Sequence, residues 1–417
     1  MSVEIWDLKK LYGQDEAAHR EEFRSLVPLF QETFGVRPER FYRAPGRVEI
    51  GGNHTDHQGG VTLSAAVDLD LKAAVSLRND GRILLQSAGY PLCETDWAGT
   101  DPKEEEKGTT AALVRGMAAG FRRKGFLPPA GEGGFNAYVI SSVPPGSGLS
   151  SSAALEILLG TILKDLYGDE SLTPLCLAQM SQQTENDYFG KPCGLLDQIS
   201  CAFGGILSVD FSREVPWVRR IRSDLSKSGY RIFMVSCGAG HENLTDEYAA
   251  IPRECAPVAA RFGAKRLCEV PETDFMGRLA ELRKELGDRA VLRAMHIYEE
   301  NRRALSEALC LQKGCMDGFI RLVNASGRSS AMYLQNVVPA GSVKHQEMLL
   351  TMAVCENALR GSGAVRVHGG GFGGTVEAFV PEEKTEEFRL RTEAVMGIGT
   401  VREIQISPVG GVRVDPE

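Results

Sequence analysis

Residues 135–167, FNAYVISSVPPGSGLSSSAALEILLGTILKDLY, decide the fold of this chain. The stretch opens with a β-prone run that contains Phe135, Val139 and Val143. Two prolines then end it, because proline lacks the backbone N–H that a strand ladder needs. After the glycine–serine loop 146–152, leucine and isoleucine recur every three or four residues, which predicts a buried helix. The sequence therefore predicts a strand, a polar loop and a helix in direct succession.

The loop between that strand and that helix has the composition of an anion-binding site. Glycine lets the backbone approach a ligand closely, and the first N–H groups of a helix lack internal partners and favour negative charge. Serine hydroxyls add donors, and one of them can reach a metal ion. The loop is not the common P-loop, because no lysine follows Gly148. A serine N-cap on an ordinary buried helix is the alternative interpretation.

Length, composition and charge describe a globular chain that is large enough for two domains. It has 417 residues, with 43% apolar and 24% charged content and a net charge of −8. This acidic balance argues against non-specific nucleic-acid binding, which needs basic surface. The N-terminus lacks the apolar core of a signal peptide, and no long uninterrupted apolar stretch suits a membrane span. Ten cysteines without C-x-x-C pairs or zinc-type spacing indicate reduced thiols in the cytoplasm.

The pattern of predicted elements changes near residue 208. Before this point, strand-like segments at 41–50 and 61–87 predominate, and the first has a turn signal at Pro45-Gly46. After it come long helical patterns, at 273–286, 288–313, 316–326 and 345–360. We therefore expect an N-terminal domain over 1–208 and a C-terminal domain over 209–417.

A polar loop framed by glycines follows the first long strand, GGNHTDHQGG at 51–60. This segment, hereafter the polar loop, packs Asn53, His54, Asp56 and His57 into five positions. A surface turn is one interpretation, since Asn, Asp and Gly favour turns. A metal site is a second, although two histidines three residues apart with one carboxylate are a weak signal. A third is a hydroxyl-rich ligand such as a sugar, and the residues alone leave all three open.

Two acidic residues and a glycine-rich segment complete the candidate features. Glu185 lies near the end of a helix predicted over 171–190, and Asp197 follows a Pro/Gly-rich turn, where a lone Asp is usually an N-cap. The segment GGGFGG at 369–374 formally matches the dinucleotide pattern G-x-G-x-x-G. It precedes a strand rather than opening a helix, so the dinucleotide interpretation fails. Its glycines still mark a close approach of backbone to another group.

Three stretches taken together, GRVEIGGNHTDHQGG, PPGSGLSSSAALE and HGGGFGG, resemble the GHMP family of small-molecule kinases. The HTD segment is similar to the galactokinase branch of that family. The likeness runs from about residue 30 to residue 380 and includes PCGLLDQI at 192–199 and EENRR at 299–303. It implies the α+β class: a two-domain GHMP-kinase fold of mixed sheets with helices, and an active site between the domains.

The same resemblance implies an activity and its partners. We expect an enzyme that transfers the γ-phosphate of ATP to the anomeric hydroxyl of galactose, with Mg²⁺ as cofactor. The implied partners are the sugar and the nucleotide, without nucleic acid or membrane. A cytoplasmic monomer is expected.

The resemblance also implies a role for each matching residue. Asp197 matches the catalytic aspartate beside the sugar C1 hydroxyl, and Arg47 matches the arginine that accompanies it. Ser152 and Glu185 match the residues that hold Mg²⁺. The matching sugar contacts are Asn53, His54, Asp56, Gly194 and Tyr248. The matching nucleotide contacts are Gly146, Ser147, Gly148, Leu149, Ser150, Ser151 and Ser152 in the phosphate loop, with Gly370 and Gly371 in the third motif.

The first motif departs from the pattern G-R-x-N-x-I-G-E-H-x-D-Y that galactokinases usually show. Glu49, Gly51, Asn53 and His57 stand where that pattern has Asn, Ile, Glu and Tyr. The usual glutamate contacts the C6 hydroxyl of the sugar. Asn53 would give up charge assistance there and remove the repulsion of a C6 carboxylate, so galacturonate or a related sugar is the alternative substrate. A sugar and nucleotide sensor without catalysis is a third option, although the segment 148–154 is intact.

Overall fold

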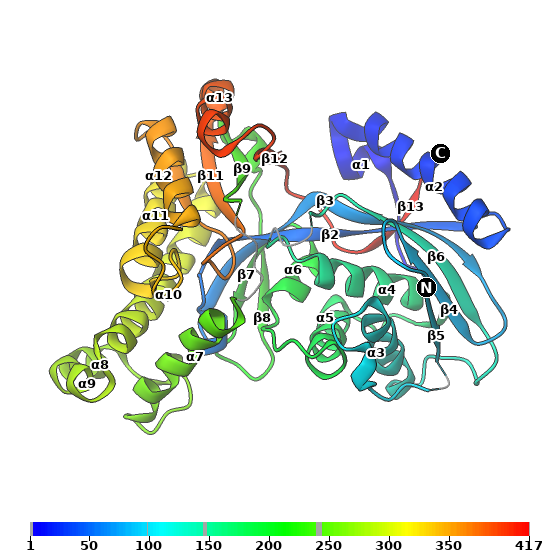
Figure 1. Ribbon diagram of the computed structural model, residues 1–417, viewed down its shortest axis with the longest axis horizontal. Helices are drawn as coiled ribbons and strands as arrows, with labels where there is room; N and C mark the ends of the chain where they lie inside the picture. The colour runs from blue at the N-terminus through cyan, green and yellow to red at the C-terminus, as the bar shows by residue number, and fades with distance from the viewer. Residues whose placement is uncertain (1–2, 98, 145–147, 239–243, 417) are drawn as a thin grey trace.

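The computed structural model describes residues 3–97, 99–144, 148–238 and 244–416, which form two lobes side by side (Figure 1). The first lobe is built on a nine-stranded mixed sheet with the order β1-β13-β2-β3-β6-β4-β5, and β7 and β8 extend from β3. The second lobe is built on a four-stranded antiparallel sheet with the order β10-β11-β9-β12. Mixed sheets and helices in two lobes confirm the expected α+β architecture.

Two long antiparallel strands form the centre of the first sheet. These are β2 (Arg40–Gly51) and β3 (Val61–Leu77), and the polar loop joins them. The other strands of this sheet are β1 (Ile5–Asp7), β4 (Arg82–Ser87), β5 (Cys93–Asp96), β6 (Gly134–Ser141), β7 (Ile206–Asp210), β8 (Trp217–Ile221) and β13 (Val412–Asp415). The second sheet contains β9 (Tyr230–Ser236), β10 (Ala364–Val367), β11 (Thr375–Pro381) and β12 (Val401–Ile404).

Helices cover both faces of the first sheet (Figure 1). On one face lie α1 (Leu8–Tyr12) and α2 (Glu16–Phe34), and on the other lie α3 (Thr110–Arg123), α4 (Ser151–Tyr167), α5 (Pro174–Thr184) and α6 (Leu196–Phe203). Every residue of α4 from Ala153 to Leu163 is buried, as expected for a helix that is apolar nearly all round. The predicted strand, loop and central helix are therefore confirmed at β6 and α4.

The small second sheet lies between two layers of helices, because successive strand residues point to opposite faces. Ile232 and Met234 of β9 belong to one buried cluster with residues of α11 (Met316–Ser329), whereas Phe233 and Val235 belong to another with residues of α12 (Glu347–Leu359) and α13 (Thr385–Met396). The helices of this lobe are α7 (Thr245–Ala260), α8 (Glu272–Gly277), α9 (Leu279–Leu286), α10 (Asp288–Lys313), α11 (Met316–Ser329), α12 (Glu347–Leu359) and α13 (Thr385–Met396). Among all the helices described, none is long and apolar enough to cross a membrane.

The boundary between the lobes lies later than the expected residue 208. Both β7 and β8 pair within the first sheet, so the chain enters the second lobe only in the segment 222–229. It returns through 405–411, and β13 then pairs antiparallel with β2. The sequence pattern did not predict β8 (WVRRI) and β13 (VRVD), because these strands are short and carry charged residues.

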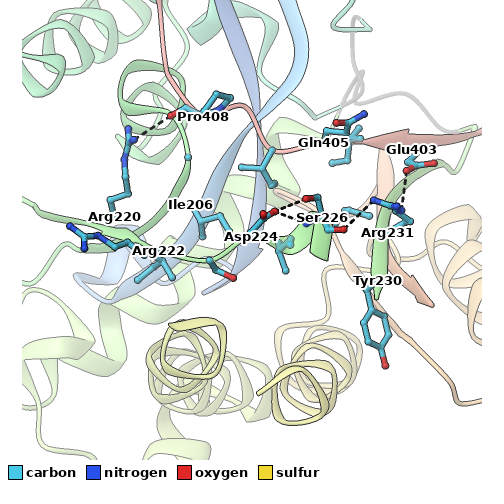
Figure 2. Close-up of a pocket in the computed structure, with 17 residues that line it drawn as sticks. Ile206, Arg220, Arg222, Asp224, Ser226, Tyr230, Arg231, Glu403, Gln405 and Pro408 are labelled. Carbon is cyan, nitrogen blue, oxygen red and sulfur yellow. Dashed lines mark hydrogen bonds and ion pairs between the residues drawn. The ribbon is translucent and has the colours of Figure 1, made fainter. Parts of the chain in front are cut away.

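The two crossings between the lobes line a cavity of about 390 Å³ (Figure 2). Asp224 bonds to Ser226 of the first crossing there, and Arg231 pairs with Glu403 at 3.8 Å. Arg220 donates to the carbonyl oxygen of Pro408 in the second crossing at 3.2 Å. None of the candidate site residues that the structure describes lines this cavity, so the candidate active site lies elsewhere.

Candidate active site

A bulge in β2 brings this central strand against the phosphate loop. The strand runs on through Pro45-Gly46, where the sequence predicted a turn, and its register against β3 shifts there. A Cβ atom on Gly46 would lie 2.9 Å from the carbonyl oxygen of Leu149, so glycine permits this close approach. The N–H of Arg47 donates to the same oxygen at 3.1 Å. The bulge therefore fixes Arg47 beside the loop.

The ion pair between Arg47 and Asp197 is the centre of the site. Nε and Nη2 of Arg47 each lie 2.6 Å from a different carboxylate oxygen, which is the bidentate geometry. Ser150 donates its hydroxyl to Oδ2 of Asp197 at 2.7 Å. Asp197 lies in the first turn of α6, but the N-cap of that helix is Leu195. The N-cap interpretation of Asp197 is therefore wrong.

The environment of Asp197 favours its ionised form. Burial raises the pKa of the carboxyl, but the charge and hydrogen bonds of Arg47 and the hydroxyl of Ser150 lower it below its usual value overall. The Asp197 side chain is 32% exposed, whereas the Arg47 side chain is nearly covered. The site therefore presents an ionised, oriented carboxylate to a ligand.

The phosphate loop turns sharply just before α4. Gly148 and Ser150 have φ of 78° and 61°, and the left-handed region is uncommon for a residue other than glycine. The bond of Ser150 to Asp197 and a bond from Nη1 of Arg47 to the Gly148 carbonyl hold this path. Helix α4 then begins at Ser151, so its first N–H groups are available to an anion. Outside the described residues lie the predicted contacts Gly146 and Ser147.

A second polar pair joins Ser152, in the first turn of α4, to Glu185. Ser152 donates its hydroxyl to Oε1 of Glu185 at 2.9 Å. Gln198 donates to Oε2 at 2.9 Å, and Nζ of Lys191 lies 3.4 Å from Oε1. Glu185 opens a π-helical turn directly after α5 rather than continuing the predicted helix. The structure therefore brings together the hydroxyl and the carboxylate that the sequence assigned to one metal ion.

The glycine segment 369–374 lies between the phosphate loop and the polar loop. A Cβ atom on Gly369 would lie 3.9 Å from the carbonyl oxygen of Gly148. Nε2 of His54 lies 3.0 Å from the carbonyl oxygen of Gly370. The hydroxyl of Tyr248 donates to the carbonyl oxygen of Gly371 at 3.2 Å. The predicted nucleotide residues of this segment thus contact predicted sugar residues, and the segment joins the two halves of the site.

Asp56 and Gly194 lie together at the start of α6. A Cβ atom on Gly194 would overlap Oδ2 of Asp56, so the glycine makes room for the carboxylate. Gly194 is exposed and Asp56 is half-buried. Because α6 also carries Asp197, the two acidic side chains are at the same end of one helix.

Asn53 is turned away from this open region, contrary to the sequence expectation. Its side chain is completely buried, and Nδ2 donates to Oε1 of Glu49 at 2.8 Å and to the Gly369 carbonyl oxygen at 2.6 Å. Oδ1 accepts from Nδ2 of Asn336 at 2.9 Å and from the Ser330 hydroxyl at 3.3 Å. These bonds occupy both donors and both acceptor positions of the amide. In this structure the Asn53 amide therefore has no donor or acceptor position left for the C6 end of a sugar.

We expect Asn53→Glu to destabilise the protein by about 3–5 kcal/mol, because it buries an unpaired carboxylate against Glu49. Urea unfolding measures this loss. In the double variant with Glu49→Gln an amide again faces a carboxylate, so part of the stability should return. Wild-type stability together with a changed sugar preference in Asn53→Glu would instead place residue 53 at the sugar.

Three hydrogen-bonding roles in this site had no direct signal in the sequence. Ser150 was expected at the nucleotide, yet its hydroxyl bonds to Asp197. Gln198 and Lys191 hold Glu185, and their only signal was their place within or beside the motif PCGLLDQI. Asn336, which bonds to Asn53, lies in no recognised motif.

Two family models match the regions that build this site. The galactokinase galactose-binding signature matches residues 28–77, which include β2, the polar loop and β3. The GHMP kinase N-terminal domain matches residues 112–205, which include Ser152, Glu185 and Asp197.

Curated relatives and solved structures agree with these models. The chain is 32% identical over 364 residues to the galactokinase of Actinobacillus pleuropneumoniae serotype 3, covering 86% of this chain and 90% of that protein. It is 30% identical over 390 residues to the galactokinase of Streptomyces coelicolor, covering 92% and 96%. The crystal structure of Lactococcus lactis galactokinase complexed with galactose has a TM-score of 0.80 at 27% identity and covers 94% of this chain and 99% of that one. The mevalonate kinase of L. major, at 14% identity and a TM-score of 0.61, shares the fold.

The fold, the site and these matches define a GHMP kinase, one of the ATP-dependent kinases of small molecules. Within that class the chain belongs to the galactokinase family. It is therefore an ATP-dependent sugar kinase, as the three sequence motifs predicted.

Proposed function

We propose that this enzyme phosphorylates galactose at its anomeric hydroxyl, with ATP as the donor. The observation that carries the proposal is the Asp197 carboxylate, which is ionised, partly exposed and held by Arg47 and by Ser150 of the phosphate loop. It stands between the start of α4, which suits phosphates, and the polar loop, which suits hydroxyl groups. The named relatives are galactokinases, and galactose is the ligand in one solved structure.

The geometry supports a direct transfer between the two substrates. Phosphoryl transfer depends on in-line positioning and on compensation of negative charge more than on covalent help. The phosphate loop and the start of α4 would hold the phosphates of ATP. Asp197 would accept the proton of the C1 hydroxyl as the new O–P bond forms. Arg47, whose own pKa is lowered by burial but raised more by Asp197, stays cationic and keeps the carboxylate in its basic form.

Ser152 and Glu185 would hold Mg²⁺. A hydroxyl and a carboxylate 2.9 Å apart are oxygen ligands of the kind that this hard cation prefers. Lys191 contacts the same carboxylate from an exposed position, so it can move aside for a second cation. Bound Mg²⁺ supplies charge neutralisation to the phosphates.

We expect Ser152→Ala and Glu185→Gln each to raise the Mg²⁺ concentration for half-maximal rate by about tenfold, since each removes one oxygen ligand or its charge. Titration of Mg²⁺ at a fixed ATP concentration measures this. Ser151→Ala is the comparison variant: its hydroxyl is on the same turn without a bond to Glu185, so we expect any effect to fall on KM for ATP and none on the Mg²⁺ requirement at saturating ATP. An unchanged Mg²⁺ requirement in both variants would remove these residues from the metal site.

A screen of free sugars for ATP-dependent phosphorylation tests the activity itself. Galactose should show the highest kcat/KM, measured by ADP release. The galacturonate alternative rested on an amide that faces C6, and the burial of Asn53 withdraws that argument. Higher kcat/KM for galacturonate would contradict the proposal, and binding of galactose without turnover would favour a sensor.

We also propose that the enzyme acts as a monomer in the cytoplasm. All ten cysteines lie in the described residues and none is joined to another by a disulfide, which suits a reducing compartment. Light scattering at micromolar concentration, with and without both substrates, tests the oligomeric state.

A further inference from the structure

Helix α10 of the second lobe holds the polar loop at both of its ends. At the start of the loop, Oε1 of Glu300 accepts the backbone N–H of Gly52 at 3.1 Å and that of Asn53 at 3.2 Å. Just after the loop, Oδ1 of Asn301 accepts the backbone N–H of Val61 at 2.7 Å. These bonds go to backbone atoms, so they fix the path of the loop whatever side chains it carries.

Glu300 is itself fixed as a buried anion. Its side chain is completely buried, the Ser326 hydroxyl donates to Oε1 at 2.6 Å, and Arg303 pairs with Oε2. Burial raises the pKa of this carboxyl, but the charges of Arg303 and Arg366 and the hydrogen bond from Ser326 lower it below its usual value overall. A charged acceptor makes stronger hydrogen bonds than a neutral one, so Glu300 is suited to hold two backbone donors.

His296 adds a third contact from one turn earlier on the same helix. Its Nε2 lies 3.0 Å from the carbonyl oxygen of Asn53, and its Nδ1 lies 2.8 Å from the Ser329 hydroxyl. Burial lowers the pKa of His296, so the neutral ring donates to the carbonyl and accepts from the hydroxyl. The start of the polar loop is therefore bonded to α10 through the N–H groups of Gly52 and Asn53 and through the carbonyl group of Asn53.

We propose that Glu300, supported by His296 and Asn301, positions the polar loop for sugar binding, so that the sugar half of the site is complete only while α10 packs against it. His54 and Asp56 lie between the two held ends. The phosphate loop is held differently, through Arg47 and its pair with Asp197. The inference rests on the proposed function in one respect, that the ligand of the polar loop is the sugar.

The test is Glu300→Gln, which keeps the size of the side chain but removes its charge and directs an amide NH₂ group at Arg303 or at the loop donors. We expect KM for galactose to rise at least about tenfold and KM for ATP to stay within about twofold. Glu299→Gln is the matched control. Glu299 is the neighbouring carboxylate, pairs with the same Arg303 at 3.3 Å and makes no bond to the polar loop, so both KM values should stay at wild-type levels.

Hydrogen exchange gives a readout that needs no activity. In Glu300→Gln, backbone amides of residues 50–62 should exchange faster than in the wild type, while those of 151–165 in α4 should not change. If the wild type does not phosphorylate galactose but this exchange pattern is seen, the proposed substrate fails and the positioning role stands.

Three results would overturn the positioning role of Glu300. They are an equal rise of both KM values, a lower melting temperature with normal galactose KM, and unchanged exchange in residues 50–62. If Glu300→Gln does not fold, Asn301→Ala replaces it, because it removes only the acceptor for the N–H of Val61. That variant should raise the galactose KM at least about threefold, and an unchanged value would equally contradict the proposal.

Discussion

Asp197→Asn is expected to lower kcat about 10²–10⁴-fold while both substrates still bind. The amide has the size of the carboxylate but cannot take the proton of the C1 hydroxyl. It also presents an NH₂ group to a guanidinium that now meets two carboxylate oxygens at 2.6 Å. Because the Asp197 side chain is partly exposed, Arg47 is the main buried charge that loses its ionic partner in this variant. The loss should therefore fall on the chemical step.

Steady-state kinetics together with calorimetric binding of galactose and of ATP separate the two effects. Asp187→Asn is the control, because Asp187 is an exposed carboxylate on the neighbouring π-helical turn. We expect it to keep wild-type kcat. Turnover close to the wild type in Asp197→Asn would show that Asp197 does not act as the base.

Local patterns in the sequence were sufficient to predict the elements whose ends are marked by glycine or proline. The helix predicted over 288–313 is found as α10 with these bounds, because Gly287 precedes it and Gly314 ends it in the left-handed conformation. The strand and helix on either side of the glycine–serine loop were equally clear. Each of these elements is long or strongly apolar, so tertiary contacts reinforce the local preference.

Other elements depend on contacts that no local pattern shows. Helix α7 contains Pro252 and Pro257, which argue against a helix in any sequence-based assignment. Strand β13 has four residues and forms only because the chain returns to the first lobe and pairs with β2. The turn expected at Pro45-Gly46 is a bulge because β3 pairs on both sides of it. In each case a partner distant in sequence overrides the local signal.

The resemblance named candidate site residues, but it could not give the orientations of their side chains. The direction of Asn53 depends on Glu49, whose carboxylate also pairs with Arg366 of β10 at 2.8 Å. Gly51, where isoleucine is usual, leaves the room that the Glu307 side chain of α10 occupies, and a Cβ atom there would overlap its carboxylate. The three residues that differ from the usual galactokinase pattern, at 49, 51 and 53, thus pack together against side chains of the second lobe.

Asp56→Ala is expected to raise the KM for galactose at least about 100-fold. Asp56 lies on a short 3-10 turn (Asp56–Gln58), and its side chain is half-buried beside the exposed Gly194. Among the described residues, no donor hydrogen-bonds to its carboxylate, so both oxygens are available to a ligand. Two sugar hydroxyls donating to this carboxylate would each contribute about 1.5–3 kcal/mol, which gives the expected loss.

The same lack of protein partners predicts that Asp56→Ala leaves the free energy of unfolding within about 1 kcal/mol of the wild type. Urea unfolding and galactose titration on the same samples separate stability from binding. Asp56→Asn is the matched variant: it keeps one acceptor oxygen without the charge, so its KM should fall between those of the wild type and Asp56→Ala. A large loss of stability with normal galactose affinity in Asp56→Ala would make Asp56 a structural residue of the polar loop. Binding of the sugar would then have to rest on His54, Gly194 and Tyr248, since the amide of Asn53 is already committed to the protein.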